Sequence, residues 1–195
     1  MNYLAHAYLS FGDPELLAGN MLSDFIKGKK RYNYPGRIQQ GITLHRAIDE
    51  FTDTHPVTAT AKQFFKPIYG LYSSPFIDIV YDHFLANDES IFKDDELSQF
   101  ANTTYRVLQQ FEGLFPPVFV TVFHYMQMHN WLLGYKHTEG IFRSFGGLVH
   151  RAKYMHDAQP ACEILIKYYD ELKECYSQFF PELKAHAYST MRSLA

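Results

Sequence analysis

The chain has 195 residues, of which 47% are hydrophobic and 20% are charged, as in ordinary globular domains and unlike disordered chains. Its formal net charge of −3 gives no general attraction to phosphate backbones, so we expect no nucleic-acid partner. Because no Lys or Arg precedes Lys27 and no apolar run approaches the ~18 residues of a membrane span, we expect a cytoplasmic protein with no secretory signal and no membrane partner.

The first strong helix signal is the run Asp13-Pro14-Glu15, which supplies an N-cap, a proline for the first helical position and an early acid. It predicts a helix from 13 to about 28, with Asn20 and Asp24 one turn apart on an edge of its apolar face. The end of this helix and the loop after it carry a basic cluster, which we define as Lys27, Lys29, Lys30 and Arg31. A solvated loop that complements the helix dipole would explain the same cluster.

The second predicted helix spans 35–55, because this stretch has no internal proline and Pro56 follows it. His45, Asp49 and Asp53 follow one another along it at four-residue steps, so their side chains share one face. A third helix is predicted from 74 to 87, where Asp78 and Asp82 are again four residues apart.

Further helices are expected at about 95–112, 118–134, 138–153, 160–178 and 182–193. The run VFVTVF at 118–123 has the propensity of a strand, but one such run cannot form a sheet. The two cysteines, Cys162 and Cys175, lack zinc-type spacing and are expected to be buried thiols. With no repeat or long linker, the sequence predicts one all-α domain over residues 1–195.

Three i, i+4 pairs of polar side chains in the first 82 residues indicate a metal site: Asn20/Asp24, His45/Asp49 and Asp78/Asp82. Carboxylates with some imidazole suit hard divalent cations such as Mn²⁺ or Mg²⁺, which leave positions for water and substrate phosphate. Each residue alone has a simpler explanation as a surface acid or a core histidine. The acids adjoin apolar faces, however, where an unpaired carboxylate is costly to bury. The candidate ligands are Asp24, His45, Asp49, Asp78 and Asp82.

Several segments resemble the acyl carrier protein phosphodiesterase family in order and spacing: MNYLAHAYLS, LLAGNMLSDFIKG, GITLHRAIDEFTDTHP, IDIVYDHFLA, WLLGY and GGLVHR. The resemblance covers about three quarters of the chain. It implies an all-helical, HD-hydrolase-like fold. It also implies a Mn²⁺-dependent enzyme that removes the 4′-phosphopantetheine arm from holo acyl carrier protein, which would then be its partner.

The resemblance also suggests roles for individual residues. Asp24 matches the family aspartate regarded as essential, and His6 is a candidate ligand or proton carrier, although a structural histidine would explain it equally well. His83 joins the candidate ligands because HD-type hydrolases use an adjacent His-Asp pair, here reversed as Asp82-His83.

Candidate substrate contacts complete the site predicted from the sequence. Arg46 and Arg151 are candidates to hold phosphate through bidentate hydrogen bonds. Trp131 and Tyr135 are candidates to wall the channel for the arm, with core packing as the alternative. Because acyl carrier proteins are acidic, part of the basic cluster is expected to steer the substrate. Asn20, which is paired with Asp24, is a further candidate. The substrate-contact candidates are therefore Asn20, Lys29, Lys30, Arg31, Trp131 and Tyr135.

Two other functions remain open on the sequence. One is a metal-dependent phosphohydrolase of the same fold that acts on a nucleotide or another small phosphodiester. The other is a noncatalytic helical module that binds carrier protein and uses its acids only as structural pairs.

Overall fold

The computed structural model describes residues 1–152 and 155–194, and all regular structure in these ranges is helical. The α-helices of the first half are α1 (Tyr3–Tyr8), α2 (Pro14–Leu22), α3 (Gly36–Thr54), α4 (Pro56–Tyr69) and α5 (Ser73–Ala86). Those of the second half are α6 (Glu96–Gln109), α7 (Pro117–Met128), α8 (Trp131–Gly134), α9 (Thr138–Arg151), α10 (Gln159–Lys167) and α11 (Tyr169–Ser193). Short 3₁₀ turns are η1 (Ser23–Phe25), η2 (Gly28–Asn33), η3 (Gly70–Tyr72) and η4 (Glu112–Leu114). The predicted all-α fold is confirmed.

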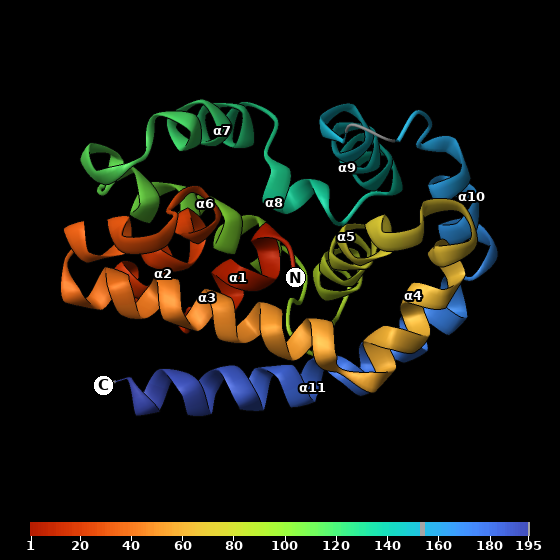
Figure 1. Cartoon of the computed structure of the whole chain (residues 1–195), viewed down its shortest axis with the longest axis horizontal. Coiled ribbons are helices and arrows are strands. Elements are labelled where there is room, and N and C mark those ends of the chain that lie inside the picture. Colours follow the sequence, from red (N-terminus) through yellow and green to blue (C-terminus); the bar gives the residue numbers. More distant parts are fainter. Residues whose placement is uncertain (153–154, 195) are drawn as a thin grey trace.

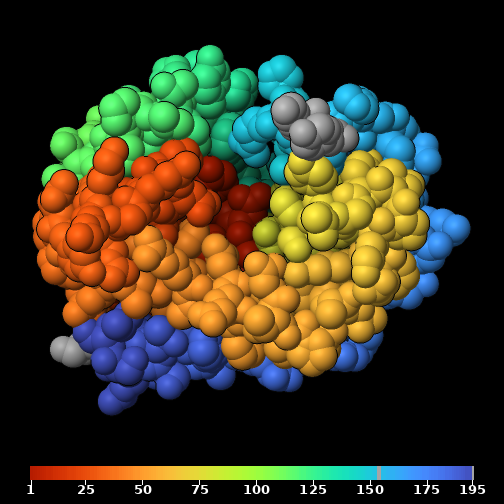
Figure 2. All heavy atoms as spheres, in the orientation of Figure 1, coloured from red at the N-terminus to blue at the C-terminus, as the bar shows by residue number. Residues whose placement is uncertain are grey.

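The short helix α1 lies at the centre of the molecule, in contact with α2 on one side and α5 on the other (Figure 1). The long helices α3 and α11 run side by side beneath it, and α7, α8 and α9 form the opposite side in this view. Figure 2 shows the consequence for the surface: residues of the N-terminal segment form the floor of a hollow whose rim belongs to later elements.

The most extensive helix contact joins α2 and α3, and two glycines make it possible. A Cβ atom on Gly19 would lie 2.1 Å from the carbonyl oxygen of Ile38, and one on Gly41 would lie 2.4 Å from that of Leu16. Since any side chain would clash with backbone at these points, only glycine permits this approach. The contact places the end of α2 beside the middle of α3, where His45 is found.

The helix predicted over 13–28 is shorter in the structure, and α2 ends at Leu22. The carbonyl oxygen of Asn20, which would bind the next helical amide, accepts a hydrogen bond from the imidazole of His45. Two 3₁₀ turns follow, and Gly28 has a positive φ of 57° that breaks any further helix. The shortening leaves Asp24 on η1, with its side chain turned to solvent.

Other helix boundaries also differ from the prediction. Helices α1 and α4 were not predicted, and 118–134 is divided because Asn130 has a left-handed backbone with φ of 44°. The last two helices meet at Tyr168 rather than near residue 180, and α11 continues through Pro181. Pro181 lies on the exposed side of α11, where solvent can satisfy the carbonyl that a proline leaves unbound.

The prediction of two buried cysteine thiols is confirmed. Cys162 and Cys175 are free and buried. None of the described helices is both long and apolar enough to cross a membrane.

Candidate metal centre and adjoining pocket

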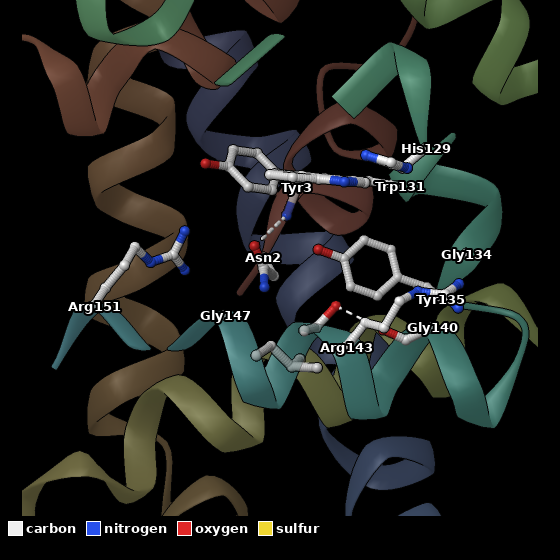
Figure 3. Close-up of a pocket in the computed structure, with 12 residues that line it drawn as sticks. Asn2, Tyr3, His129, Trp131, Gly134, Tyr135, Gly140, Arg143, Gly147 and Arg151 are labelled. Atoms are coloured by element: carbon white, nitrogen blue, oxygen red, sulfur yellow. Dashed lines mark hydrogen bonds between the residues drawn. The ribbon is translucent and has the colours of Figure 1, made fainter. Parts of the chain in front are cut away.

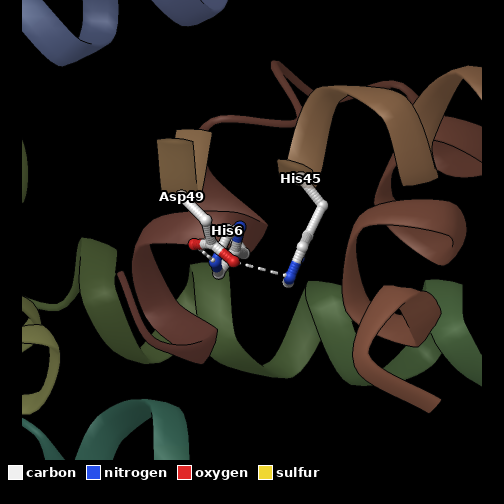
Figure 4. A group of neighbouring side chains, drawn as sticks. All are labelled: His6, His45 and Asp49. Atoms are coloured by element: carbon white, nitrogen blue, oxygen red, sulfur yellow. Dashed lines mark ion pairs between the residues drawn. The ribbon is translucent and has the colours of Figure 1, made fainter. Parts of the chain in front are cut away.

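Three helical elements, α1, α3 and η1, bring two histidines and two aspartates together. His6 comes from α1, His45 and Asp49 from α3, and Asp24 from η1; Figure 4 shows the first three converging. The Nε2 atom of His45 lies 3.0 Å from one oxygen of Asp49 and 3.1 Å from Asp24, and the Nε2 atom of His6 lies 3.2 Å from the other oxygen of Asp49. We call these four residues the His-Asp cluster.

The tautomer of His6 follows from a buried hydrogen-bond network around Asn20. The amide nitrogen of Asn20 lies 2.9 Å from the carbonyl oxygen of His6, which can only accept, so the amide orientation is fixed. The amide oxygen of Asn20 therefore faces Nδ1 of His6 at 2.8 Å, and Nδ1 must carry the proton. The lone pair of Nε2 points into the cluster, where no described group donates a hydrogen bond to it.

His45 is held in the same way by the backbone of α2. Its Nδ1 atom donates to the carbonyl oxygen of Asn20 at 2.8 Å, which leaves Nε2 facing the two aspartates. The two imidazole rings stack with centroids 4.0 Å apart. One residue thus orients both histidines, through its side chain for His6 and its backbone for His45.

The charges of the cluster are strongly coupled. Burial lowers the pKa of His6 to about 4, and the neighbouring His45 adds to this effect. Burial also lowers the pKa of His45, but its hydrogen bonds to Asp24 and Asp49 outweigh burial and raise the pKa to about 9. Burial raises the pKa of Asp49, yet the hydrogen bond from His45 and the positive charge of the nearby α-amino group hold that pKa well below the usual range. At neutral pH the cluster therefore contains a neutral His6 and an ionised Asp49.

This donor set fits a divalent cation. Ligand atoms of His6, His45 and Asp49 all lie within 4.8 Å of one another. Neighbouring ligands of an octahedral ion with bonds of ~2.1 Å are about 3.0 Å apart, close to the separations found here. Both imidazoles present Nε2 inward while a hydrogen bond fixes Nδ1, which is the usual support of histidine ligands. The unsatisfied Nε2 of His6 is a buried polar atom that such an ion would satisfy.

The remaining predicted ligands lie around α1 rather than in this cluster. Asp78 binds the α-amino group of Met1 at 3.0 Å. Asp82 is fully buried and accepts hydrogen bonds from the backbone amides of Asn2, Leu4 and Ala5, so it caps the helix that carries His6. Burial is the largest influence on its pKa and raises it to about 7.

His83 also lies away from the cluster. Its Nδ1 atom donates to the carbonyl oxygen of Tyr135 at 2.7 Å, and its Nε2 atom lies 3.0 Å from the hydroxyl of Tyr169. Both ring nitrogens are therefore occupied, and the residue anchors the end of α8 to α5 and α11.

A pocket of about 220 Å³ opens beside the cluster, between α1, α5, α8 and α9. Figure 3 shows Asn2, Tyr3, Trp131, Tyr135 and Arg151 around the same space. Burial raises the pKa of Tyr3 to about 12, with a further contribution from Asp24 that Arg151 opposes, so this ring lies within the fields of both the cluster and the pocket. The full lining is Asn2, Tyr3, Ile79, His129, Trp131, Gly134, Tyr135, Gly140, Arg143, Ser144, Gly147 and Arg151.

The structure thus gathers three of the predicted substrate contacts in one pocket: Trp131, Tyr135 and Arg151. It adds Arg143 and Gly147, which we did not predict. Their signal was available, because Gly140, Arg143, Ser144, Gly147 and Arg151 recur at three- and four-residue steps on one side of α9.

Two other groups of predicted residues occupy different positions. Asn20 is fully buried beneath the histidines, where it orients them. Arg46 is exposed on α3, and Lys29 and Lys30 are exposed on η2. Arg31 lies beside them with its guanidinium over the ring of Tyr32.

Comparison with known proteins agrees with the resemblance seen in the sequence. The model of the family described as acyl carrier protein phosphodiesterase matches residues 1–183. Proteins named acyl carrier protein phosphodiesterase are similar to this chain: one from Enterobacter sp. (strain 638) is 29% identical, and one from Salmonella paratyphi A is 30% identical. Each match covers 96% of this chain and 97% of the relative.

A protein of the same name from Klebsiella pneumoniae subsp. pneumoniae is 29% identical over 94% of this chain and 95% of its own. No solved structure matches the chain, so the HD-hydrolase-like character of the fold stays a prediction. The family model and the relatives both extend over nearly the whole sequence. The chain belongs to the acyl carrier protein phosphodiesterase family.

Proposed function

We propose that this protein hydrolyses the phosphodiester that links 4′-phosphopantetheine to holo acyl carrier protein, and that it requires Mn²⁺ or Mg²⁺. Membership of the family supports the substrate. The inward Nε2 atoms of His6 and His45, next to Asp49 and Asp24, support the metal. The single observation that carries the proposal is this convergence of two oriented imidazoles and two carboxylates beside a pocket. A cytoplasmic location remains part of the proposal.

The reaction transfers the phosphoryl group to water. His6, His45 and Asp49 would hold a divalent cation, which would polarise a phosphoryl oxygen and lower the pKa of a coordinated water. The side chain of Asp24 is 70% exposed and ionised, since its hydrogen bond with His45 lowers its pKa, so it can orient the attacking water and accept its proton. Water oxygen bonds to phosphorus, the bond from phosphorus to the serine oxygen breaks, and that oxygen takes a proton to give the apo protein.

The pocket supplies the binding site for the arm in this proposal. Trp131, Tyr135 and Tyr3 offer ring surfaces for its apolar portion. Arg151 and Arg143 provide guanidinium groups for the phosphate, and neither forms an ion pair with a described carboxylate. Arg46 stays a candidate phosphate contact from the exposed side of α3.

The deciding experiment is an assay of holo carrier protein by intact-protein mass spectrometry with Mn²⁺, with chelator, and with chelator followed by excess Mn²⁺. We expect conversion to the apo form with metal, none with chelator, and recovery on addition of the ion. If nucleotides or small phosphodiesters are hydrolysed but none of several holo carrier proteins is, the result would favour the small-substrate phosphohydrolase. Binding of carrier protein without any hydrolysis would favour the noncatalytic module.

The pocket can be closed at one glycine without touching the cluster. Gly147 lines the pocket, and a Cβ atom there would meet no other atom, so a larger side chain would extend into free space. We expect Gly147→Leu to lower kcat/KM for holo carrier protein by about 10²-fold, as misplacement of a substrate does. Turnover of a small phosphodiester such as bis(p-nitrophenyl) phosphate should change less than about twofold, because the ligands stay in place.

Gly146 is the matched control for this substitution. It precedes Gly147 on α9, also has open space at its Cβ position, and does not line the pocket. Gly146→Leu should leave both activities unchanged. If both variants lose carrier-protein turnover equally, the pocket does not hold the arm.

A further inference from the structure

The outward side of α7 exposes apolar side chains beside Thr121 and His124 and carries no acidic or basic charge from Asp, Glu, Lys or Arg. The segment 117–130 contains no Asp, Glu, Lys or Arg. Val118, Tyr125 and Met128 are 64%, 49% and 59% exposed, and their spacing of seven and three residues places them along one stripe of the helix. We call these three residues the α7 stripe. The opposite side of α7 is buried through Phe119, Phe123 and Met126.

A helix that carries large apolar side chains on both sides normally has neighbours on both sides. Here the described chain covers only one of them. Exposed apolar surface rimmed by polar groups marks contact sites for partners more often than isolated apolar residues do. The α7 stripe therefore indicates an interaction surface.

The two ends of α7 connect this helix to features already described. Near its C-terminal end, the ring of Tyr125 is parallel to that of His129, with centroids 6.2 Å apart, and His129 lines the pocket. Near its N-terminal end, the ring of Phe119 packs against the ring of Phe25, with centroids 5.1 Å apart. Phe25 is the residue that follows Asp24. The chain continues from Phe25 directly into the basic cluster on η2.

Figure 2 shows the orange segment that includes η2 and the green segment that includes α7 as neighbours on the same side of the hollow. The segment that carries the α7 stripe thus neighbours the segment that carries the positive charges. A partner that matches both must combine exposed apolar residues with acidic ones.

We propose that the α7 stripe and the basic cluster together dock the protein part of the substrate, through an acidic, amphipathic surface of the carrier protein. This inference rests on the proposed function and names the surface that function needs. The scissile bond joins the arm to a folded protein, so residues beside the pocket mouth must contact that protein while the arm is in the pocket. The positive charges steer an acidic partner, and the stripe buries its apolar residues.

The test is a pair of substitutions that add the same charge at equally exposed apolar positions. Val118 on the α7 stripe and Ile166 on α10 are both 64% exposed. Val118→Glu should weaken binding of apo carrier protein, measured by calorimetry without metal, by about tenfold or more, as loss of a central interface contact does. It should raise KM for holo carrier protein by a similar factor and leave hydrolysis of bis(p-nitrophenyl) phosphate unchanged. Ile166→Glu should change none of these.

A second variant tests the electrostatic half of the surface. Replacing Lys29, Lys30 and Arg31 with Ala should also weaken carrier-protein binding, and the loss should shrink as salt is raised because these charges are exposed. Neutral Met128→Gln should weaken binding by a factor that salt does not remove.

Several outcomes would overturn the docking surface. Equal effects of Val118→Glu and Ile166→Glu would show that added charge, and not the stripe, matters. A second outcome is that the wild-type protein binds phosphatidylserine vesicles and that Val118→Glu abolishes this binding without changing the affinity for carrier protein. That result would assign the surface to a membrane. Because apo carrier protein is the binding probe, the docking proposal can succeed or fail independently of whether holo carrier protein is hydrolysed.

Discussion

Asp49→Asn is expected to lower kcat for holo carrier protein by ~10³-fold, since a metal-assisted step loses several kcal/mol of stabilisation when the ion is lost or displaced. Asp49 is the residue whose two carboxylate oxygens face the two histidines of the cluster, at 3.2 Å and 3.0 Å. The amide keeps the shape of the side chain but removes its charge and replaces one acceptor by a donor. Mn²⁺ binding, followed by calorimetry and by electron paramagnetic resonance, should weaken in parallel.

Asp53 provides a matched control on the same helix. It lies one turn after Asp49, is exposed, and pairs with Lys62 at 2.9 Å instead of the cluster. Asp53→Asn should leave turnover and Mn²⁺ affinity within about twofold of the wild type, as expected for an exposed ion pair. Unchanged metal affinity in Asp49→Asn would remove this residue from the ligand set.

The second large effect separates two aspartates that the sequence presents as equivalent. Asp24→Ala should lower kcat by ~10²–10⁴-fold, the range of a general base, and weaken Mn²⁺ binding. The melting temperature of the Asp24→Ala variant should hardly change, because the side chain of Asp24 is largely exposed. Asp82→Ala should instead destabilise the fold by about 2–4 kcal/mol, since it leaves buried amides of Asn2, Leu4 and Ala5 without their acceptor. For a chain of this size that is a fall in melting temperature of roughly 5–15 °C.

Differential scanning calorimetry and Mn²⁺ titration on the same samples test this separation. Titration of Asp82→Ala should be done well below its melting temperature, where we expect a metal affinity close to that of the wild type. Asp82→Asn, which retains one acceptor oxygen, should recover part of the lost stability. A large loss of metal affinity in folded Asp82→Asn, with normal melting, would return Asp82 to the ligand set.

The sequence predicted elements well where local signals are strong. The helix over 35–55 corresponds to α3 (Gly36–Thr54), because apolar periodicity and a following proline define it. The end of α2 was not predictable in this way, since it depends on a hydrogen bond from His45, which is 25 residues away in the chain. The six residues of α1 were missed because their helix is capped by Asp82 from α5.

The same limit applies to the site. Four-residue spacing put His45, Asp49 and Asp53 on one face of α3, but spacing cannot tell which turn meets α1. Asp78 and Asp82 show the same spacing as Asn20 and Asp24. Asp78, however, binds the α-amino group of Met1, and Asp82 accepts hydrogen bonds from backbone amides of α1. Tertiary packing distinguishes these pairs. The pocket residues Arg143 and Gly147 belong to a pattern on α9 that gains meaning only when α1 and α8 lie opposite.

The direct backbone contact between Gly19 and Gly41 sets how far η1 stands from α3, and with it the distance between Asp24 and His45. Relieving contacts of 2.1 Å and 2.4 Å with backbone atoms requires a displacement of about an ångström, whereas coordination geometry responds to tenths of an ångström. A methyl group at either glycine would therefore push α2 away from α3, displace Asp24 from His45 and weaken the packing of the two helices at the same time. Inherited changes at these two hidden positions would cost a relative both its stability and its hold on the cation.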